Sequence, residues 1–245
     1  MMKSIAIYNN KGGCGKSTSV INLAYQFSLD SKVLVIDTDG QSNTSQFFLD
    51  EPKSGLEKVL LGQSKTVSAE NTRYTNLDVI SATAAINNVV STFSGFTEKK
   101  QRDIADRLVN SDSGYDYVLV DLPPTMNDVT RQIITACDYV FVPVELGTFA
   151  IQGIPNVTDV ISKNKARFGG AYVNKFDRKN SADIELFKMF SEQLGNNSLT
   201  TAIPYSKVIK NSITYSLTAQ EYMGWNSAGK AFGLLADEIR ERIGE

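Results

Sequence analysis

The sequence predicts a doubly wound α/β fold, in which helices cover both faces of a mostly parallel sheet. Strand-like and helix-like segments alternate along the chain, and strands such as Lys32–Ile36 and Tyr117–Val120 are continuously apolar. Such strands are typical of a parallel sheet buried on both faces, because a solvated face would require alternating polar residues. The 245 residues contain no internal repeat and no Pro-rich linker, so we expect a single domain over residues 1–245.

Apolar runs and helical periodicity place the individual elements. The expected strands are Ser4–Tyr8, Lys32–Ile36, Leu77–Ile80, Tyr117–Val120, Tyr139–Val142 and Gly170–Val173. The expected helices are Lys16–Ser28, Glu98–Val109, Asn127–Ala136, Gly153–Lys163, Ile184–Leu194 and Ser227–Ile243. The weakly periodic stretch 41–68 is expected to form loops with short helices.

The composition excludes several classes of site. The chain has no histidine, which excludes a Ser-His-Asp triad, a His-ligated metal and a histidine pH switch. Its two cysteines, Cys14 and Cys137, are too few for a disulfide framework or a zinc site, so a reducing cytoplasm is expected. The beginning of the chain lacks a signal-peptide apolar region, and no apolar run approaches the ~20 residues that span a bilayer.

A Gly-rich loop between the first strand and the first helix gives the strongest functional signal. Residues 10–18 read NKGGCGKST, although the standard phosphate loop, G-x-x-x-x-G-K-[ST], would have Gly at position 10. Backbone N–H groups of such a loop and of the following helix bind phosphate oxygens. The expected nucleotide-binding residues are Gly12, Gly13, Cys14, Gly15, Lys16, Ser17 and Thr18. Lys16 would reach the β- and γ-phosphates, and the Ser17 hydroxyl would bind Mg²⁺.

Lys11 is a second cation at the entrance of this loop. One bound nucleotide does not need it within one subunit. Lys11 is therefore either a solvated lysine or a residue that reaches a partner's phosphates and stabilises their charge in trans, as an arginine finger does.

Three carboxylates follow predicted strands and should meet at one edge of the sheet, next to the phosphate loop. These are Asp37, Asp39 and Asp121. Asp121 fits a role in holding Mg²⁺ through a water, and Asp37 fits a place in its outer shell. Asp39 could orient or deprotonate the attacking water, because no histidine is present. The alternative for each is an aspartate that caps the next turn.

Taken together, these motifs resemble the ParA/Soj-type partition ATPases of the deviant-Walker MinD/ParA group of P-loop proteins. The resemblance covers nearly the whole chain. It is carried by residues 11–18, 37–43, 121–124, 142–144, Phe149-Ala150 with Gly153, Val173-Asn174 and Ile203-Pro204.

The resemblance implies an ATP- and Mg²⁺-dependent homodimer that encloses two nucleotides. Lys11 would then contact the other subunit's ATP, and Asn174 and Pro204 would line the adenine pocket. It also implies non-specific DNA binding by the ATP-bound dimer, a ParB-type centromere-binding partner that stimulates hydrolysis, and a nucleoid-associated, cytoplasmic location. Lys11, Lys16 and Asp39 are the expected catalytic residues.

The sequence departs from the family pattern in three places. Gly40 stands where the family usually has Pro, Thr44 stands where a small residue is usual, and 205–210 lack the arginines that often follow Ile203-Pro204.

Charge is unevenly distributed along the chain despite a net charge of −2. The segment 163–210 carries nine Lys and Arg against four Asp and Glu, which marks a candidate DNA footprint. The best individual candidates are Arg178, Lys179, Lys207 and Lys210, and the alternative is a solvated face without a partner. The end of the chain is acid-rich, so we expect a packed helix there and no membrane anchor.

Three functions remain open from the sequence. The first is a DNA-segregation ATPase. The second is an ATPase of the same superfamily that positions or regulates proteins without DNA. The third is a nucleotide-gated binding module with negligible turnover.

Overall fold

The computed structural model describes residues 2–53, 55–110, 114–147, 158–161, 166–224 and 226–244. Within these residues, seven strands form one sheet in the order β3-β4-β2-β5-β1-β6-β7. The strands are β1 (Lys3–Ile7), β2 (Val33–Asp37), β3 (Glu70–Asn71), β4 (Leu77–Ile80), β5 (Tyr117–Asp121), β6 (Tyr139–Glu145) and β7 (Arg167–Asn174). Every pair of neighbours is parallel except β3 with β4, which confirms the predicted doubly wound class.

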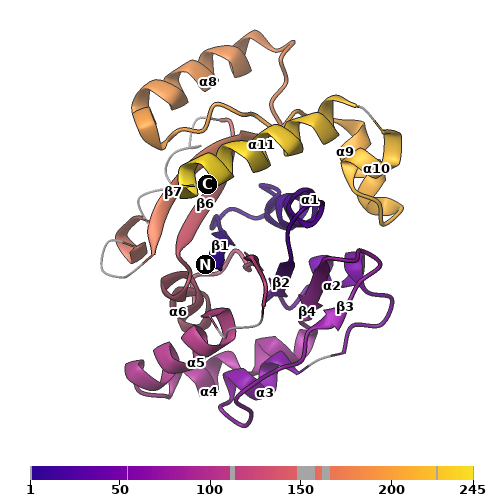
Figure 1. The fold of residues 1–245 in the computed structure, drawn as a ribbon. Helices are drawn as coiled ribbons and strands as arrows, with labels where there is room; N and C mark the ends of the chain where they lie inside the picture. Colours follow the sequence, from indigo (N-terminus) through magenta and orange to yellow (C-terminus); the bar gives the residue numbers. More distant parts are fainter. Residues whose placement is uncertain are drawn as a thin grey trace.

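Helices cover both faces of this sheet (Figure 1). One side is covered by α3 (Leu56–Leu60), α4 (Val90–Ser94), α5 (Glu98–Asn110) and α6 (Asp128–Ala136). The other side is covered by α1 (Lys16–Ser28), α2 (Asn43–Phe48), α9 (Lys207–Thr214), α10 (Ala219–Met223) and α11 (Ser227–Ile243). The helix α8 (Ser181–Leu194) follows β7 and buries Phe190. Two short 3-10 helices, η1 (Ala84–Asn88) and η2 (Gly195–Asn197), complete the described elements.

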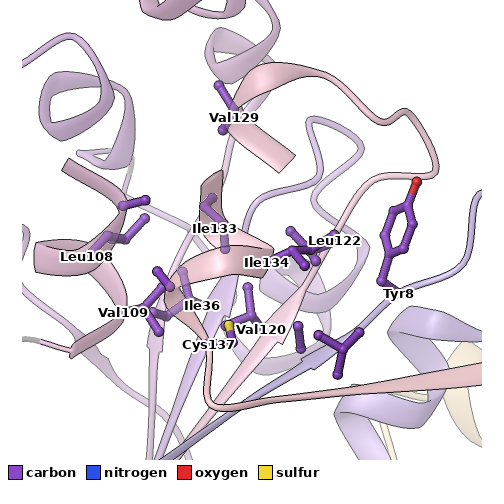
Figure 2. Packing of buried hydrophobic residues seen from close by; sticks show 14 of the residues in the cluster. Tyr8, Ile36, Leu108, Val109, Val120, Leu122, Val129, Ile133, Ile134 and Cys137 are labelled. Carbon is purple, nitrogen blue, oxygen red and sulfur yellow. The ribbon is translucent and has the colours of Figure 1, made fainter. Parts of the chain in front are cut away.

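The core lies in two layers, one on each face of the sheet. Successive residues of a strand point to opposite faces, so Ala6 and Val120 enter one hydrophobic cluster while Ile5, Ile7 and Leu119 enter the other. Figure 2 shows part of the first cluster, where apolar residues of α5 and α6 pack onto β2 and β5. Because both faces are covered, the sheet has no solvated side and its strands lack polar alternation.

Strand register brings three strand ends together. Asp37 at the end of β2 pairs with Asp121 at the end of β5, and Asp121 pairs with Ile7 at the end of β1 on its other side. The loop that leaves β1 therefore starts beside both carboxylates.

Several element bounds differ from the sequence expectation, because tertiary pairing lengthens or adds elements. β6 and β7 extend to Glu145 and Asn174 because they pair along their whole length, and Gly169 accommodates the Phe141 ring at an irregular register. The sequence did not indicate β3, α4, α9 and α10 as separate elements, since each has eight residues or fewer. The helix expected at Gly153–Lys163 lies mostly outside the described residues, of which only 158–161 are described and helical. Phe149, Ala150 and Gly153 also lie outside them.

Candidate active site

The phosphate loop joins β1 to α1, and two of its glycines have left-handed backbone conformations. Gly13 has a φ of 74° and Gly15 a φ of 94°. A Cβ atom on Gly15 would collide with Nδ2 of Asn174, so this position requires glycine for its space as well as its φ. That same Nδ2 donates a 2.7 Å hydrogen bond to the carbonyl oxygen of Cys14. Asn174, at the end of β7, therefore supports the loop from behind.

The N-terminus of α1 is open. Its N-cap is Gly15, which makes no side-chain capping hydrogen bond. The first turn (Lys16, Ser17, Thr18) contains no acidic residue. The first N–H groups of a helix lack intrahelical partners and carry the positive end of the helix dipole. Free donors of this kind, next to a Gly-rich loop, form an anion site that suits phosphate.

Lys16 brings a positive charge into this site. Its side chain is buried, and Nζ donates a 3.4 Å hydrogen bond to the carbonyl oxygen of Lys11 across the loop. Lys16 makes no ion pair with any described residue. Its charge is therefore available to a bound anion.

Lys11 has a fixed backbone and an exposed side chain. The side chain of Asn9 accepts a 2.9 Å hydrogen bond from the Lys11 N–H and donates one of 2.7 Å to the carbonyl oxygen of Pro143. The Lys11 side chain is 59% exposed and lies 3.8 Å from Glu145, which also pairs with Lys175 at 3.1 Å. An exposed, shared ion pair of this kind is weak, so Lys11 can leave Glu145 at little cost. Its role in trans stays a prediction.

Asp121 has the features of a metal-binding carboxylate. It is buried, and Oδ2 accepts a 2.7 Å hydrogen bond from Oγ1 of Thr44, while Oδ1 has no partner in the described residues. Burial and the nearby Asp37 charge raise the pKa of Asp121 well above its usual range, and the hydroxyls of Thr44 and Ser17 oppose that effect. A buried oxygen without a partner is costly, and a hard cation would satisfy it. The residues present therefore fit Mg²⁺ held by Ser17, Asp121 and phosphate oxygens.

Both carboxylate oxygens of Asp37 accept hydrogen bonds from the protein. Its Oδ2 accepts hydrogen bonds from the backbone N–H and the hydroxyl of Ser45, at 2.9 and 2.7 Å, and its Oδ1 accepts one from the Asp39 N–H at 3.0 Å. Burial raises the pKa of Asp37, and the Ser45 bonds oppose that effect. In this structure, Asp37 positions α2 and the Asp39 backbone, and its predicted outer-shell role toward Mg²⁺ stays a prediction.

Asp39 faces the pocket at the start of a tight turn. Its Oδ1 accepts a 2.9 Å hydrogen bond from the Gln41 N–H, and the side chain is half-buried. The neighbouring turn after β5 is rigid, because it contains Pro123-Pro124 and because the Tyr8 hydroxyl donates a 3.2 Å hydrogen bond to the Pro124 carbonyl oxygen.

The phosphate loop, Lys16, Ser17 and Asp39 line one cavity of about 800 Å³, which is large enough for a nucleotide; Lys11, Asp37 and Asp121 are not among its lining residues. Its walls come from the phosphate loop, the start of α1, the β2–α2 turn, η1, the β5–α6 turn and the α9–α10 turn. The lining residues are Gly12, Gly13, Gly15, Lys16, Ser17, Thr18, Ile21, Asp39, Gln41, Asn43, Gln46, Phe47, Asn87, Pro123, Pro124, Thr125, Ile213 and Ser216.

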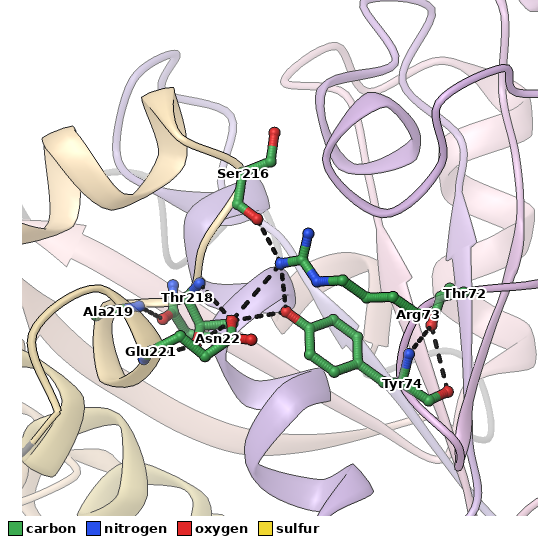
Figure 3. Close-up of polar contacts among 8 residues, drawn as sticks. All are labelled: Asn22, Thr72, Arg73, Tyr74, Ser216, Thr218, Ala219 and Glu221. Carbon is green, nitrogen blue, oxygen red and sulfur yellow. Dashed lines mark hydrogen bonds and ion pairs between the residues drawn. The ribbon is translucent and has the colours of Figure 1, made fainter.

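A polar network holds the α9–α10 turn at the rim of this cavity (Figure 3). The Tyr74 hydroxyl donates a 2.7 Å hydrogen bond to Glu221, and Arg73 donates to the Ser216 carbonyl oxygen and lies 3.6 Å from Glu221. Glu221 also completes a capping box with Thr218 at the start of α10. The network therefore ties the turn before β4 to the α9–α10 turn, and it fixes Ser216 beside the cavity.

Four further predicted binding residues, Asn174, Pro204, Arg178 and Lys179, lie outside this cavity. The Asn174 side chain donates its hydrogen bond to the Cys14 carbonyl oxygen behind the loop, as described above. Pro204 lines a second cavity of about 650 Å³, together with Arg178 and Lys179. Their predicted adenine and DNA contacts stay predictions.

The remaining two candidate DNA contacts, Lys207 and Lys210, lie exposed on α9. That helix leads directly into the turn that rims the first cavity.

Sequence reasoning missed the contacts that support the site. The Thr44 bond to Asp121 and the Ser45 bonds to Asp37 come from α2, and the only signal for them was two hydroxyl residues shortly after two aspartates. The polar network around Arg73 had no local signal in the sequence, because Arg73 and Tyr74 are more than 140 residues away from their partners Ser216 and Glu221.

Comparison with known proteins shows the family of the chain. The model of the AAA domain family matches residues 2–171, which is well over half of the chain. The chain belongs to this family. It is 29% identical to the chromosome partitioning protein ParA of Caulobacter vibrioides, over 98% of this chain and 95% of that protein. This similarity supports a ParA/Soj-type P-loop ATPase domain.

Solved structures share the fold over the whole chain. A McdA–ATP complex from Cyanothece has a TM-score of 0.85 at 19% identity, covering 99% of this chain and 96% of that one. The septum site-determining protein MinD of Pyrococcus horikoshii, complexed with Mg-ADP, has a TM-score of 0.83 at 21% identity, covering 100% and 98%.

In the part of the chain that the structure describes, no helix combines the length and the apolar character needed to cross a bilayer.

Proposed function

We propose that this protein is an ATP- and Mg²⁺-dependent DNA-segregation ATPase, which dimerises on ATP, binds DNA non-specifically and is reset by partner-stimulated hydrolysis. One observation carries the nucleotide chemistry. The uncapped start of α1, with the buried charge of Lys16, lies beside a buried Asp121 oxygen that has no partner among the described residues. Phosphate and Mg²⁺ together satisfy all of these groups.

The residues divide the work of hydrolysis. Backbone N–H groups of Gly13, Gly15 and the first turn of α1 bind phosphate oxygens, and Lys16 neutralises charge on the γ-phosphate. Bound Mg²⁺, held by Ser17 and Asp121, would supply further neutralisation of phosphate charge. Asp39 accepts the proton of the attacking water, a role for which the chain has no histidine.

The proposed dimerisation rests on the position of Lys11. Its exposed side chain makes one weak ion pair, with Glu145, among the residues that the structure describes. In the proposed dimer it exchanges Glu145 for the phosphates of the partner's ATP. Family membership supports this role, since the residues 11–18 match the deviant phosphate loop.

DNA binding rests on the exposed cations Arg178, Lys179, Lys207 and Lys210. A ParB-type protein is the proposed partner that stimulates hydrolysis, and the proposed location is the cytoplasm, on the nucleoid. The similarity to ParA supports these proposals, and the structural likeness to McdA and MinD supports equally an ATPase that positions proteins without DNA.

An electrophoretic shift assay separates the two functions. For segregation, the wild type shifts non-specific DNA with ATP and not with ADP or without nucleotide, and the shift weakens as salt rises. The Lys207→Glu/Lys210→Glu variant should lose the shift and keep its ATPase activity. Equal binding in all nucleotide states contradicts DNA segregation, and the absence of any shift favours the positioning function. An unchanged shift for the variant would exclude Lys207 and Lys210 as the DNA contacts.

Phosphate release tests the third possibility, a binding module with negligible turnover. Asp39→Ala should abolish hydrolysis measured with DNA and partner present. Rates that do not differ between this variant and the wild type would support the module.

A further inference from the structure

Several polar side chains that line the cavity, among them Gln46, Asn87 and Thr125, are used neither by the sequence motifs nor by the contacts described so far. Asn87 differs from the other two in its contact with Gly40. Asn87 belongs to η1, where Thr83 caps the helix and the buried Ile86 anchors it. Asn87 itself is exposed into the cavity, and its carboxamide makes no hydrogen bond with the described residues. It lies on a fixed support with both its donor and its acceptor free.

The Asn87 carboxamide lies directly over Gly40. A Cβ atom at position 40 would collide with Nδ2 of Asn87 and lie 2.5 Å from its Oδ1. Gly40 is not among the glycines with positive φ, so its backbone does not require glycine. The absence of a side chain at position 40 therefore serves to leave room for Asn87. Proline, which the resemblance leads one to expect here, would fill the same space.

Because Asp39 directly precedes Gly40, this contact brings Asn87 into the neighbourhood of Asp39, and both residues line the same cavity as the phosphate loop. An ionised Asp39 can only accept hydrogen bonds. A carboxamide supplies what it lacks, since its NH₂ group can donate to a phosphate oxygen while its oxygen accepts from a water.

We propose that Asn87 is a further catalytic residue, which holds the attacking water between Asp39 and the γ-phosphate. The proposal rests on the proposed ATPase function. The water oxygen forms a bond to the γ-phosphorus as the bond to the β–γ bridging oxygen breaks, the water proton passes to Asp39, and ADP and phosphate leave. Asn87 exchanges no proton and orients the water, as the glutamine of small GTPases does.

A double-mutant cycle on positions 40 and 87 tests this role. Asn87→Ala should lower kcat for ATP about tenfold, the effect of one lost positioning hydrogen bond, and leave KM within about twofold. Gly40→Ala should have a similar effect, because the new Cβ displaces the flexible carboxamide without disturbing the fold. Since both changes remove the same group, the double variant should be no slower than Asn87→Ala.

Controls separate catalysis from folding. Asn88→Ala, at the exposed neighbouring position, should keep wild-type kcat, and all variants should keep the wild-type Tm and nucleotide Kd. Wild-type turnover in Asn87→Ala, or effects of the two single changes that multiply in the double variant, would overturn the role of Asn87 alone. Absence of turnover in the wild type, with DNA and partner present, would instead refute the proposed function and this role with it.

Discussion

Helices α1 and α11 pack against each other but begin in opposite ways. At the start of α11, the side chain of Asn226 accepts hydrogen bonds from the N–H groups of Ala228 and Gly229, both at 2.9 Å. At the start of α1, the N-cap is a left-handed glycine, which has no side chain to accept hydrogen bonds from the first N–H groups.

The difference shows where folding and binding compete for the same groups. A capping side chain contributes about 1 kcal/mol to stability, and α11 gains that contribution. Helix α1 lacks this capping contribution, and its first N–H groups are available to a ligand. The beginning of α1 violates the ordinary rule for a helix N-terminus, and such violations are expected at functional sites. Four variants sharpen this comparison, in order of decreasing effect.

Lys16→Gln should have the largest effect. Removing a preorganised charge from the phosphates lowers kcat for ATP by roughly 100- to 1,000-fold. Lys230→Gln is the matched control, because Lys230 lies near the start of α11 and is exposed there. Phosphate release should be unchanged in the control, and a similar loss in both variants would show that position near a helix start, and not the phosphate loop, is responsible.

Gly15→Ala should unfold or distort the loop. Its Cβ would displace the Asn174 carboxamide from Cys14 and would force alanine into a left-handed conformation, at a combined cost of about 3 kcal/mol. Gly244→Ala, after α11, shares the positive φ, at 86°, but meets nothing within 4 Å, so about 1–2 kcal/mol is expected. Urea unfolding measures both losses, and equal losses would contradict the role of the Asn174 contact.

Asp121→Asn should make the ligand-free protein more stable while it slows hydrolysis. The pKa of Asp121 is raised in the folded state, so the folded protein binds more protons than the unfolded chain between the ordinary and the raised value. Wild-type stability therefore falls as pH rises through that interval, by roughly 1.4 kcal/mol for each pH unit that the interval spans.

The Asp121→Asn variant keeps an acceptor for Thr44 and has no carboxyl at this position to lose a proton. Urea unfolding of the variant and of the wild type, each at pH 5 and pH 8, measures the difference, and phosphate release measures the slower hydrolysis. A variant that loses stability from pH 5 to pH 8 as steeply as the wild type would contradict the prediction.

Asn226→Ala should have the smallest effect and should act on folding alone. It removes the acceptor of two N–H groups at the start of α11, so the free energy of unfolding should fall by about 1 kcal/mol. For a chain of this size, that lowers Tm by roughly 2–4 °C. ATP turnover of the folded protein should stay at the wild-type rate, and a loss of turnover would show that the two helix starts are not independent.

The sequence predicted the parts of the site that are local in the chain. The phosphate loop and the aspartates at strand ends lie within motifs of a few residues, and parallel pairing brings them to one edge of the sheet. Their neighbours in sequence were enough to place Lys16, Asp39 and Asp121.

The supporting contacts could not be predicted in this way. Asn174 reaches Cys14 across 160 residues, and Asn87 lies over Gly40 from a short 3-10 helix. Such contacts depend on how separate segments pack, and a single sequence carries no local pattern for them. The same holds for the network of Arg73 and Glu221 at the rim of the cavity (Figure 3).

Amide hydrogen exchange with and without Mg-ATP tests the central claim most directly, because it reports on the N–H groups that distinguish the two helix starts. Mg-ATP should slow exchange in residues 13–18, whose donors are free for phosphate, and leave residues 227–230 unchanged, where Asn226 already caps the helix. Unchanged exchange in residues 13–18 at saturating Mg-ATP would contradict the account.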